Sequence, residues 1–407
     1  MSSLPKRFAP FLQRAHSIFW KSGNPLYVIF FVTNRCNARC EHCFVDHDVN
    51  ARLELTVDEY EIISQKMGPL LFAFFTGGDA FIREDLPDIV RPFARRNGLR
   101  KIQMPTAGAH AEPTVRLTRE VLAAAPEAHL GVSISIDGIE EDHDRVRRVP
   151  GLFKRAMETY YALKDLAAHH DNLAVNVGLT FSAMNQDTAL ETYRYLRDKV
   201  GAGNILYTVV RGQPKNPASR FLDIAKLQRF NAEVDADIVH GGHGYSGFPF
   251  ASFINAKNLV AHELNIDQLQ NPHFRMPCYA GKLSAVVDYQ GTIFPCEMLS
   301  KPLGSLREND YDFQKIWKGH LAEEARKFIK DSKCFCTHEC FLSTNILFTP
   351  SMMPTVLRKW ASIEVGKRFG SRPNAPADAP VAVTTTTPEQ VASNIVALSG
   401  ARTADPE

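Results

Sequence analysis

Apolar runs alternate with helix-like segments six times along the first 240 residues, and this alternation constrains the fold more than any other feature. Runs of β-branched and aromatic residues are typical of strands that are buried on both faces. Thr56 and Glu59 have the spacing of a capping box at the start of the first expected helix. Repeated strand–helix units predict a parallel sheet with helices outside it, in a complete or partial barrel. The expected strands are residues 26–33, 70–76, 101–104, 130–136, 173–180 and 205–210.

The pattern changes after residue 240. A turn at 289–291 between two short apolar runs predicts a β-hairpin, and a helix is expected over 313–329. The C-terminal helix mixes basic and apolar residues; we expect it to pack on the protein body, although a membrane-surface helix has a similar composition. The expected organisation is an N-terminal helical segment (1–24), a barrel (25–240), a connector (241–271), a hairpin-and-helix domain (272–348), a C-terminal helix (349–370) and a disordered tail (371–407).

Charge and hydropathy exclude several function classes. The chain has 47 Lys and Arg residues against 45 Asp and Glu, so its net charge of +2 creates no general attraction to nucleic acid. No apolar run approaches the roughly 20 residues of a transmembrane helix. Basic residues interrupt residues 1–20, which makes this segment a poor signal peptide. We therefore expect a cytoplasmic protein whose thiols are reduced, with no nucleic-acid partner and no transmembrane segment.

The eight cysteines fall into two groups with none between them. Clustered cysteines in a reducing compartment more often bind metal than form disulfides. The sequence therefore predicts two separate metal sites. The first group is Cys36, Cys40 and Cys43, and the second is Cys278, Cys296, Cys334, Cys336 and Cys340.

The first group has the spacing C-x3-C-x2-C and follows the first expected strand. In parallel α/β barrels, chemistry gathers at this end of the strands. Three thiolates on one loop bind three irons of a [4Fe–4S] cluster and leave the fourth iron open to a substrate or cofactor. The alternative is a structural zinc closed by His42 or His47, in a non-catalytic zinc or iron–sulfur scaffold protein.

This spacing, at this place in the fold, resembles the radical S-adenosylmethionine (SAM) superfamily. The resemblance implies an α/β fold with a partial (β/α)6 TIM-type barrel, in which SAM binds the open iron. It also implies a low-potential electron donor of the flavodoxin or ferredoxin type. Reductive cleavage of SAM would give a 5′-deoxyadenosyl radical that removes a substrate hydrogen.

Further motifs match this superfamily at the expected strand ends. Gly77-Gly78-Asp79 stands where the family has Gly-Gly-Glu, and the sequence Ser135 to Asp137 resembles its ribose-side motif. Ala107 replaces the asparagine of the family's Thr-Asn-Gly, so a polar role there is not carried over. The cofactor-binding residues that the resemblance implies are His42, Gly77, Gly78, Asp79, Ser135 and Asp137.

The second group combines Cys278 and Cys296, which the hairpin brings together, with three cysteines after the next helix. Four thiolates make a closed site for an auxiliary [4Fe–4S] cluster, although zinc bound by four cysteines has the same ligands. The group resembles the SPASM/Twitch auxiliary-cluster domain of radical SAM enzymes. Five cysteines suggest the Twitch form with one cluster, and the residues leave open which of Cys334, Cys336 and Cys340 is not a ligand.

The substrate stays open between two classes. A small metabolite or carbohydrate is one, because a Twitch-type aminoglycoside dehydrogenase has a similar gap between its first two auxiliary cysteines. A ribosomal peptide is the other, but the segment before Leu26 is too short for the winged-helix domain that peptide modifiers often have. In either class the auxiliary cluster would aid oxidation or bond formation. Polar residues expected near the substrate are His110, Tyr207, Arg211 and Glu297, types that more often have structural roles.

Overall fold

The computed structural model describes residues 23–45, 53–246, 250–369 and 386–400. Its sheet has the strand order β6-β5-β4-β3-β2-β1-β7-β8-β9. The first six strands are parallel and in chain order, which confirms the α/β fold with a partial barrel. These strands are β1 (Tyr27–Thr33), β2 (Phe72–Gly77), β3 (Lys101–Thr106), β4 (His129–Ser135), β5 (Leu173–Phe181) and β6 (Ile205–Val209).

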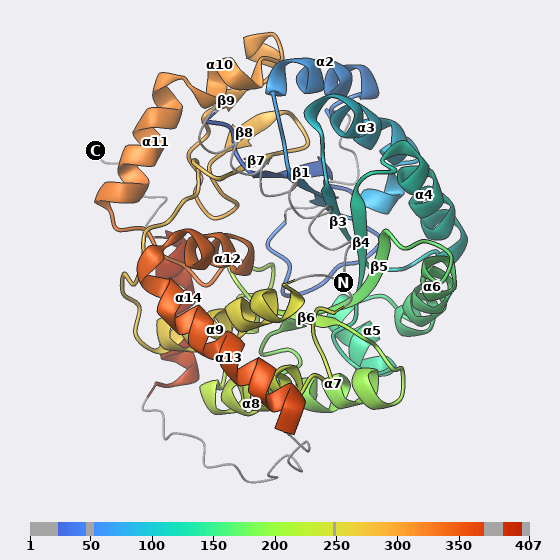
Figure 1. The fold of residues 1–407 in the computed structure, drawn as a ribbon, viewed down its shortest axis with the longest axis vertical. Coiled ribbons are helices and arrows are strands. Elements are labelled where there is room, and N and C mark those ends of the chain that lie inside the picture. The colour runs from blue at the N-terminus through green and yellow to red at the C-terminus, as the bar shows by residue number, and fades with distance from the viewer. Residues whose placement is uncertain (1–22, 46–52, 247–249, 370–385, 401–407) are drawn as a thin grey trace.

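Helices cover the outside of these strands (Figure 1). The capping box predicted at Thr56 and Glu59 is present at the start of the first of them. These helices are α2 (Val57–Met67), α3 (Leu86–Pro92), α4 (Ala111–Ala124), α5 (Glu141–Arg147), α6 (Leu152–Ala167), α7 (Ala189–Asp198) and α8 (Ile224–Val239).

Burial alternates along β2, β3 and β6. In β3, Ile102 and Met104 are fully buried, whereas Lys101 and Gln103 are only partly buried. The buried residues belong to the core that packs under the helices. Because successive side chains of a strand point to opposite faces, the partly buried ones face the inside of the barrel. In these strands the outer face therefore belongs to the apolar core, and the inner face is less deeply buried.

The predicted hairpin continues the barrel sheet. Strand β7 (Ser284–Val287) pairs in parallel with β1, starting at Tyr27, and β8 (Thr292–Phe294) and β9 (Gly304–Ser305) follow in antiparallel pairing. The single helix predicted over 313–329 is wrong, because Gly319 separates α10 (Phe313–Trp317) from α11 (His320–Asp331). After α11 comes α12 (Glu339–Phe348).

Two predictions about irregular segments were wrong. The expected connector, 241–271, contains the long helix α9 (Ala251–Gln270), which packs against several neighbouring helices and buries residues around its circumference. The expected tail, 371–407, contains α14 (Pro388–Gly400), where Val391 is buried and Asn394 donates a hydrogen bond of 2.6 Å to the Leu269 carbonyl. Packing against α9 stabilises α14 despite its tail-like composition.

The remaining described helix is α13 (Met353–Phe369), which lies where the C-terminal helix was expected and packs on α8 and α9. Residues 1–22 of the expected helical segment 1–24 lie outside the described residues, and so does His47. Within the described ranges, no helix is by itself long and apolar enough to cross a bilayer. One pair, α12 with residues 350–368, reaches that length and apolarity only together and is bent by 90°.

Candidate active site

The first cysteine loop follows β1 and is held from behind by backbone hydrogen bonds. Arg39 donates from its amide to the Arg147 carbonyl at 3.0 Å, near the end of α5. On the other side, the Lys215 amide donates to the Cys43 carbonyl at 2.9 Å. The loop that carries the cysteines is thus fixed to the segments that follow β4 and β6.

The three thiols of this loop share an apolar environment. Cys36, Cys40 and Cys43 pack with Ala38, Ala107, Ala109 and Leu152. Burial raises the pKa of the Cys36 thiol to about 12 and that of Cys40 to about 11. Metal ligands must be thiolates, so these thiols need the positive charge of a bound metal to ionise. Three cysteines of one loop in this apolar environment fit an iron–sulfur cluster.

The Gly77-Gly78-Asp79 turn packs directly on this loop. The Gly78 amide donates to the Thr33 carbonyl at 2.8 Å, and the Asp79 amide donates to the Arg35 carbonyl at 2.9 Å. A Cβ atom on Gly78 would lie only 1.9 Å from the Arg35 carbonyl oxygen. Both glycines are therefore needed for the close approach of the turn to the cysteine loop.

The Asp79 side chain ties this turn to the end of β3. Its carboxylate is buried and accepts hydrogen bonds from the Phe81 amide at 3.1 Å, the Thr106 hydroxyl at 2.8 Å and the Ala107 amide at 2.9 Å. The side chain of residue 107 is not needed for this contact. Asp79 thus orders two strand ends beside the cysteines.

Asp137 is the centre of a buried polar network on the opposite side of the cysteine loop. Arg147 donates to its carboxylate at 2.7 and 2.8 Å, and the His42 Nε2 atom lies 3.6 Å away. Burial raises the pKa of Asp137, but the Arg147 guanidinium holds it below its ordinary value. Burial lowers the pKa of His42 to about 4, and among the described residues its Nδ1 atom has no hydrogen-bond partner. An uncharged imidazole with an unused ring nitrogen fits a polar cofactor such as SAM. Ser135 ends β4 nearby and is partly exposed.

Arg211 joins residues that adjoin both cysteine groups. Its guanidinium lies 5.2 Å from the centre of the Phe44 ring, beside Cys43. It also lies 3.5 Å from the Glu297 carboxylate, next to Cys296, and 3.6 Å from the Glu339 carboxylate, next to Cys340. The structure therefore brings Arg211 and Glu297 together, and Arg211 contacts residues next to both cysteine groups.

The charges in this contact are well defined. Glu297 is buried, which raises its pKa, but His338 and Arg211 together lower the pKa to about 2. Glu339 also accepts a hydrogen bond from the Val209 amide at the end of β6, at 2.9 Å. His338 and Glu339 were missed from the sequence, although their position beside Cys340 was a usable signal.

Two other candidate residues lie apart from this contact. Tyr207 is buried on the helix side of β6, where its hydroxyl donates to Asn231 and its ring lies 4.7 Å from that of His262. The structure does not bring Tyr207 to the cysteines. His110 is exposed at the start of α4, one residue after Ala109, which packs with the first cysteine group.

The second cysteine group lies beside β1. Cys278, Cys296, Cys334 and Cys340 belong to one packed cluster with aromatic side chains of the inner barrel face, including Tyr27, Phe72 and Phe74. Burial raises the pKa of the Cys340 thiol to about 12. The thiols of this group come from separate chain segments. Like those of the first group, they fit a metal cluster, whose positive charge would favour the thiolate form.

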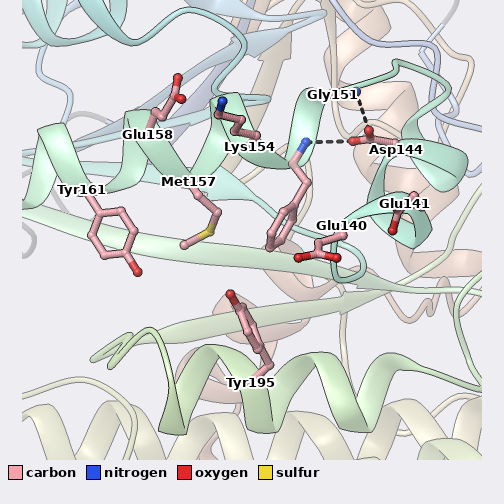
Figure 2. Close-up of a pocket in the computed structure, with 10 residues that line it drawn as sticks. Glu140, Glu141, Asp144, Gly151, Lys154, Met157, Glu158, Tyr161 and Tyr195 are labelled. Carbon is pink, nitrogen blue, oxygen red and sulfur yellow. Dashed lines mark hydrogen bonds between the residues drawn. The ribbon is translucent and has the colours of Figure 1, made fainter.

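The pocket in Figure 2 is a different place on the molecule. Its volume is about 540 Å³, and it lies between α5, α6 and α7 on the outside of the barrel. None of the candidate site residues lines it. The lining residues are Glu140, Glu141, Asp144, Gly151, Phe153, Lys154, Met157, Glu158, Tyr161 and Tyr195.

A partial (β/α)6 barrel with three cysteines after its first strand, and a second cysteine group beside it, defines a barrel-type iron–sulfur protein. The chain belongs to the radical SAM superfamily, whose family model matches residues 30–196. A second model, the SPASM iron–sulfur cluster-binding domain, matches residues 278–341. Members of this family are SAM-dependent enzymes, so the alternative of a structural zinc scaffold was wrong.

Curated relatives fall into several activities. Fe-coproporphyrin III synthase of Methanosarcina barkeri is 28% identical over 175 residues, 42% of this chain and 39% of that protein. Pre-heme d1 synthase of Dinoroseobacter shibae is 24% identical, covering 78% of this chain and 80% of that protein. The subtilosin biosynthesis protein AlbA of Bacillus subtilis is 22% identical, with coverages of 78% and 68%. The chain spans 63% of another B. subtilis relative, the sporulation killing factor maturation protein SkfB.

Solved structures share the fold. Native anSMEcpe with bound AdoMet aligns with a TM-score of 0.55 at 14% identity, covering 85% of this chain and all (100%) of that one. SuiB of Streptococcus suis, bound to S-adenosylmethionine, aligns with a TM-score of 0.53 at 14% identity, with coverages of 78% and 72%. These similarities confirm the barrel architecture.

Proposed function

We propose that this chain cleaves SAM reductively and removes a hydrogen atom from a substrate held inside the barrel. The observation that carries this proposal is the meeting, at Arg211, of residues that directly neighbour cysteines of both groups. We assign Cys36, Cys40 and Cys43 to the first cluster, within a barrel of residues 25–240, and the second cysteine group to an auxiliary cluster in residues 272–348. When bound, SAM and the first cluster supply a 5′-deoxyadenosyl radical, and the auxiliary cluster exchanges electrons.

The residues of the chain have distinct tasks in this scheme. His42, the two glycines and the strand ends ordered by Asp79 and Asp137 would hold SAM against the first cysteine group. Arg211 is held between two carboxylates, and among the described residues its Nε–H has no hydrogen-bond partner. This donor is available to a polar group of the substrate, which it would orient between the two clusters.

Two substrate classes have support. A small metabolite is our first candidate: the relative whose own length is best covered among those described above, pre-heme d1 synthase, is named for a small-molecule product. A ribosomal peptide is the second candidate, since AlbA and SkfB are named for bacteriocin biosynthesis and killing-factor maturation and match 78% and 70% of this chain. We propose a flavodoxin- or ferredoxin-type electron donor for either class, and a cytoplasmic location.

The test of SAM cleavage uses protein purified and reconstituted without oxygen. With dithionite and SAM, the wild type should release 5′-deoxyadenosine, measured by liquid chromatography and mass spectrometry. Cys40→Ala should lose this activity because it removes one of the three ligands that hold the first cluster. Lys154→Gln, on the outer surface, is the control and should retain it. A wild type that carries both clusters but releases no 5′-deoxyadenosine contradicts the proposal.

The substrate class is tested with the same assay. Small-molecule and peptide fractions from cells grown in heavy water are added separately. Hydrogen abstraction transfers deuterium to 5′-deoxyadenosine, so the fraction that produces labelled 5′-deoxyadenosine contains the substrate class. Labelling by the peptide fraction alone contradicts our first candidate.

A further inference from the structure

Two lysines approach the second cysteine group from different parts of the barrel. Lys101 is the first residue of β3 and faces the barrel interior, with its ammonium 5.0 Å from the centre of the Phe72 ring. Lys257 lies on α9 and is only 7% exposed. Its ammonium donates a hydrogen bond of 2.8 Å to the hydroxyl of Ser343 on α12. Both ammonium groups therefore lie in the part of the interior that α12 borders.

Neither lysine has an acidic partner. Across the described ranges of the chain, no carboxylate lies within 4.0 Å of either ammonium group, whereas Arg211 nearby has two carboxylates within that distance. Burial and the nearby Lys101 lower the pKa of Lys257 to about 8. Placing two like charges together away from water is unfavourable unless an anion compensates them.

Both lysines contact residues that lie close to Cys340. Cys340 lies one turn before Ser343 on α12, and Phe72, under the Lys101 ammonium, packs in the same cluster as Cys340. A [4Fe–4S] cluster with four thiolate ligands is an anion, and its negative charge increases on reduction. The missing counter-charge therefore coincides with the expected auxiliary cluster.

We propose that Lys101 and Lys257 are the cationic counter-charges of the auxiliary cluster and raise its reduction potential. The inference rests on the proposed function, through the assignment of Cys340 to that cluster. Positive charges near a cluster stabilise its reduced form more than its oxidised form, because the reduced form carries the larger negative charge. The lysines thereby make the cluster a better acceptor of one electron.

The test measures the midpoint potential of the auxiliary cluster in the reconstituted holoprotein, by redox titration monitored with electron paramagnetic resonance. No SAM or substrate is added. Lys101→Gln and Lys257→Gln should each lower the equilibrium constant for reduction by about tenfold, equivalent to about 59 mV for a one-electron couple. Lys257→Arg keeps the charge and should restore a potential close to that of the wild type. Lys226→Gln, an exposed lysine paired with Asp187, is the control and should not change the potential.

Each result decides the question. Glutamine variants that bind the cluster at the wild-type potential overturn the inference. If a glutamine variant does not bind the cluster, the result for Lys257→Arg decides. A cluster that binds to Lys257→Arg at the wild-type potential supports the role of the charge. Failure of Lys257→Arg to bind the cluster shows that the lysine has another role and overturns the inference. Absence of a second cluster from the wild type refutes the proposed function as well. An unchanged potential with both clusters present refutes only this inference.

Discussion

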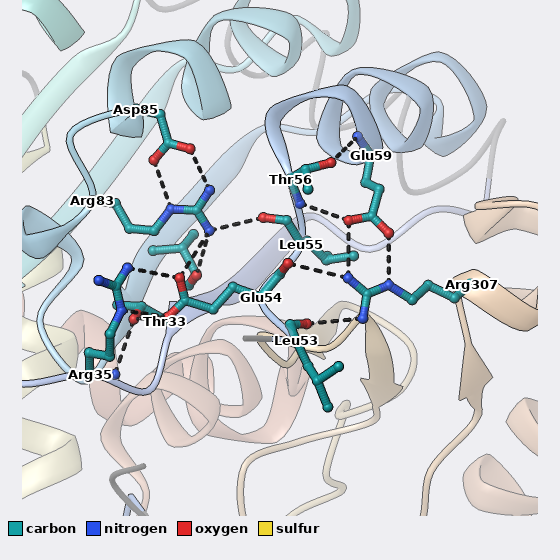
Figure 3. A network of polar contacts seen from close by, with 11 residues as sticks. Thr33, Arg35, Leu53, Glu54, Leu55, Thr56, Glu59, Arg83, Asp85 and Arg307 are labelled. Carbon is teal, nitrogen blue, oxygen red and sulfur yellow. Dashed lines mark hydrogen bonds and ion pairs between the residues drawn. The ribbon is translucent and has the colours of Figure 1, made fainter. Parts of the chain in front are cut away.

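Arg307 connects the auxiliary domain to the segment that follows the first cysteine loop (Figure 3). It donates to the Glu59 carboxylate at 2.7 and 3.1 Å and to the Leu53 carbonyl at 3.0 Å. Glu54, next in the chain, binds Arg35 with two hydrogen bonds of 2.9 Å. Because Arg35 precedes Cys36, the ion pair between Arg307 and Glu59 stabilises a path of contacts from one cysteine group to the other.

The ion pair can be tested by Glu59→Gln, which keeps an oxygen for the capping bond from the Thr56 amide and removes the charge. Burial raises the pKa of Glu59, but Arg307 and the other donors lower it from 4.5 to about 2. At about 1.4 kcal/mol per pKa unit, this shift corresponds to roughly 3 kcal/mol at most. The pair is partly exposed, with Glu59 at 14% and Arg307 at 32%, so solvent screening reduces its value to about 1–2 kcal/mol.

Native-state hydrogen exchange of the segment 53–67, read by mass spectrometry, measures this loss. Glu59→Gln should increase local exchange about 5- to 30-fold, the population change that corresponds to 1–2 kcal/mol. The depressed pKa means that the stabilisation is present above about pH 4.5 and is lost as the pH falls toward 2. The effect should therefore be the same at about pH 6 and about pH 8 once intrinsic exchange rates are corrected.

Glu112→Gln is the matched control, because Glu112 is 81% exposed and its oxygen lies 3.9 Å from Arg116 on the same helix. This variant should exchange like the wild type in segment 53–67. Equal exchange in Glu59→Gln and wild type refutes the assigned strength of the Arg307 contact.

Two further predictions concern the cysteine groups. Gly78→Ala should reduce the iron content of the first cluster, because its Cβ would lie 1.9 Å from the Arg35 carbonyl oxygen and displace the cysteine loop; iron content equal to the wild type contradicts this. Cys336→Ser should retain the auxiliary cluster while Cys296→Ser loses about four irons, since Cys296 packs with Cys278, Cys334 and Cys340; iron loss in Cys336→Ser contradicts this ligand set.

The barrel could be predicted from the sequence because its strands are short apolar runs that are separated by regular helices. Helix α9 could not be predicted in this way, because it is surrounded by α8, α12, α13 and α14. Its buried residues include Asn255, Lys257 and Gln268, so no apolar stripe repeats with the period of a helix. Polar residues in a buried helix are recognisable only from the partners that surround them.

The cysteine spacing predicts two metal-binding groups, and the structure packs the cysteines of each group into one cluster, apart from Cys336. The residues between the two groups depend on contacts distant in sequence. Arg211 and Glu297 were chosen for their chemistry and position near strand ends or cysteines, and they are in contact. Tyr207 was chosen on the same grounds but faces the helices, because a side chain's face follows from strand register. A one-residue uncertainty in register reverses that prediction.

The central claim is that the first cluster has an iron without a protein ligand, to which SAM binds. Mössbauer spectroscopy of protein reconstituted with iron-57, recorded with and without SAM, tests this directly. We expect about eight irons in two [4Fe–4S] clusters, and one of these irons should change its isomer shift when SAM is added. Spectra in which SAM changes no iron site, or in which a cubane cluster is absent from the first cysteine group, would contradict it.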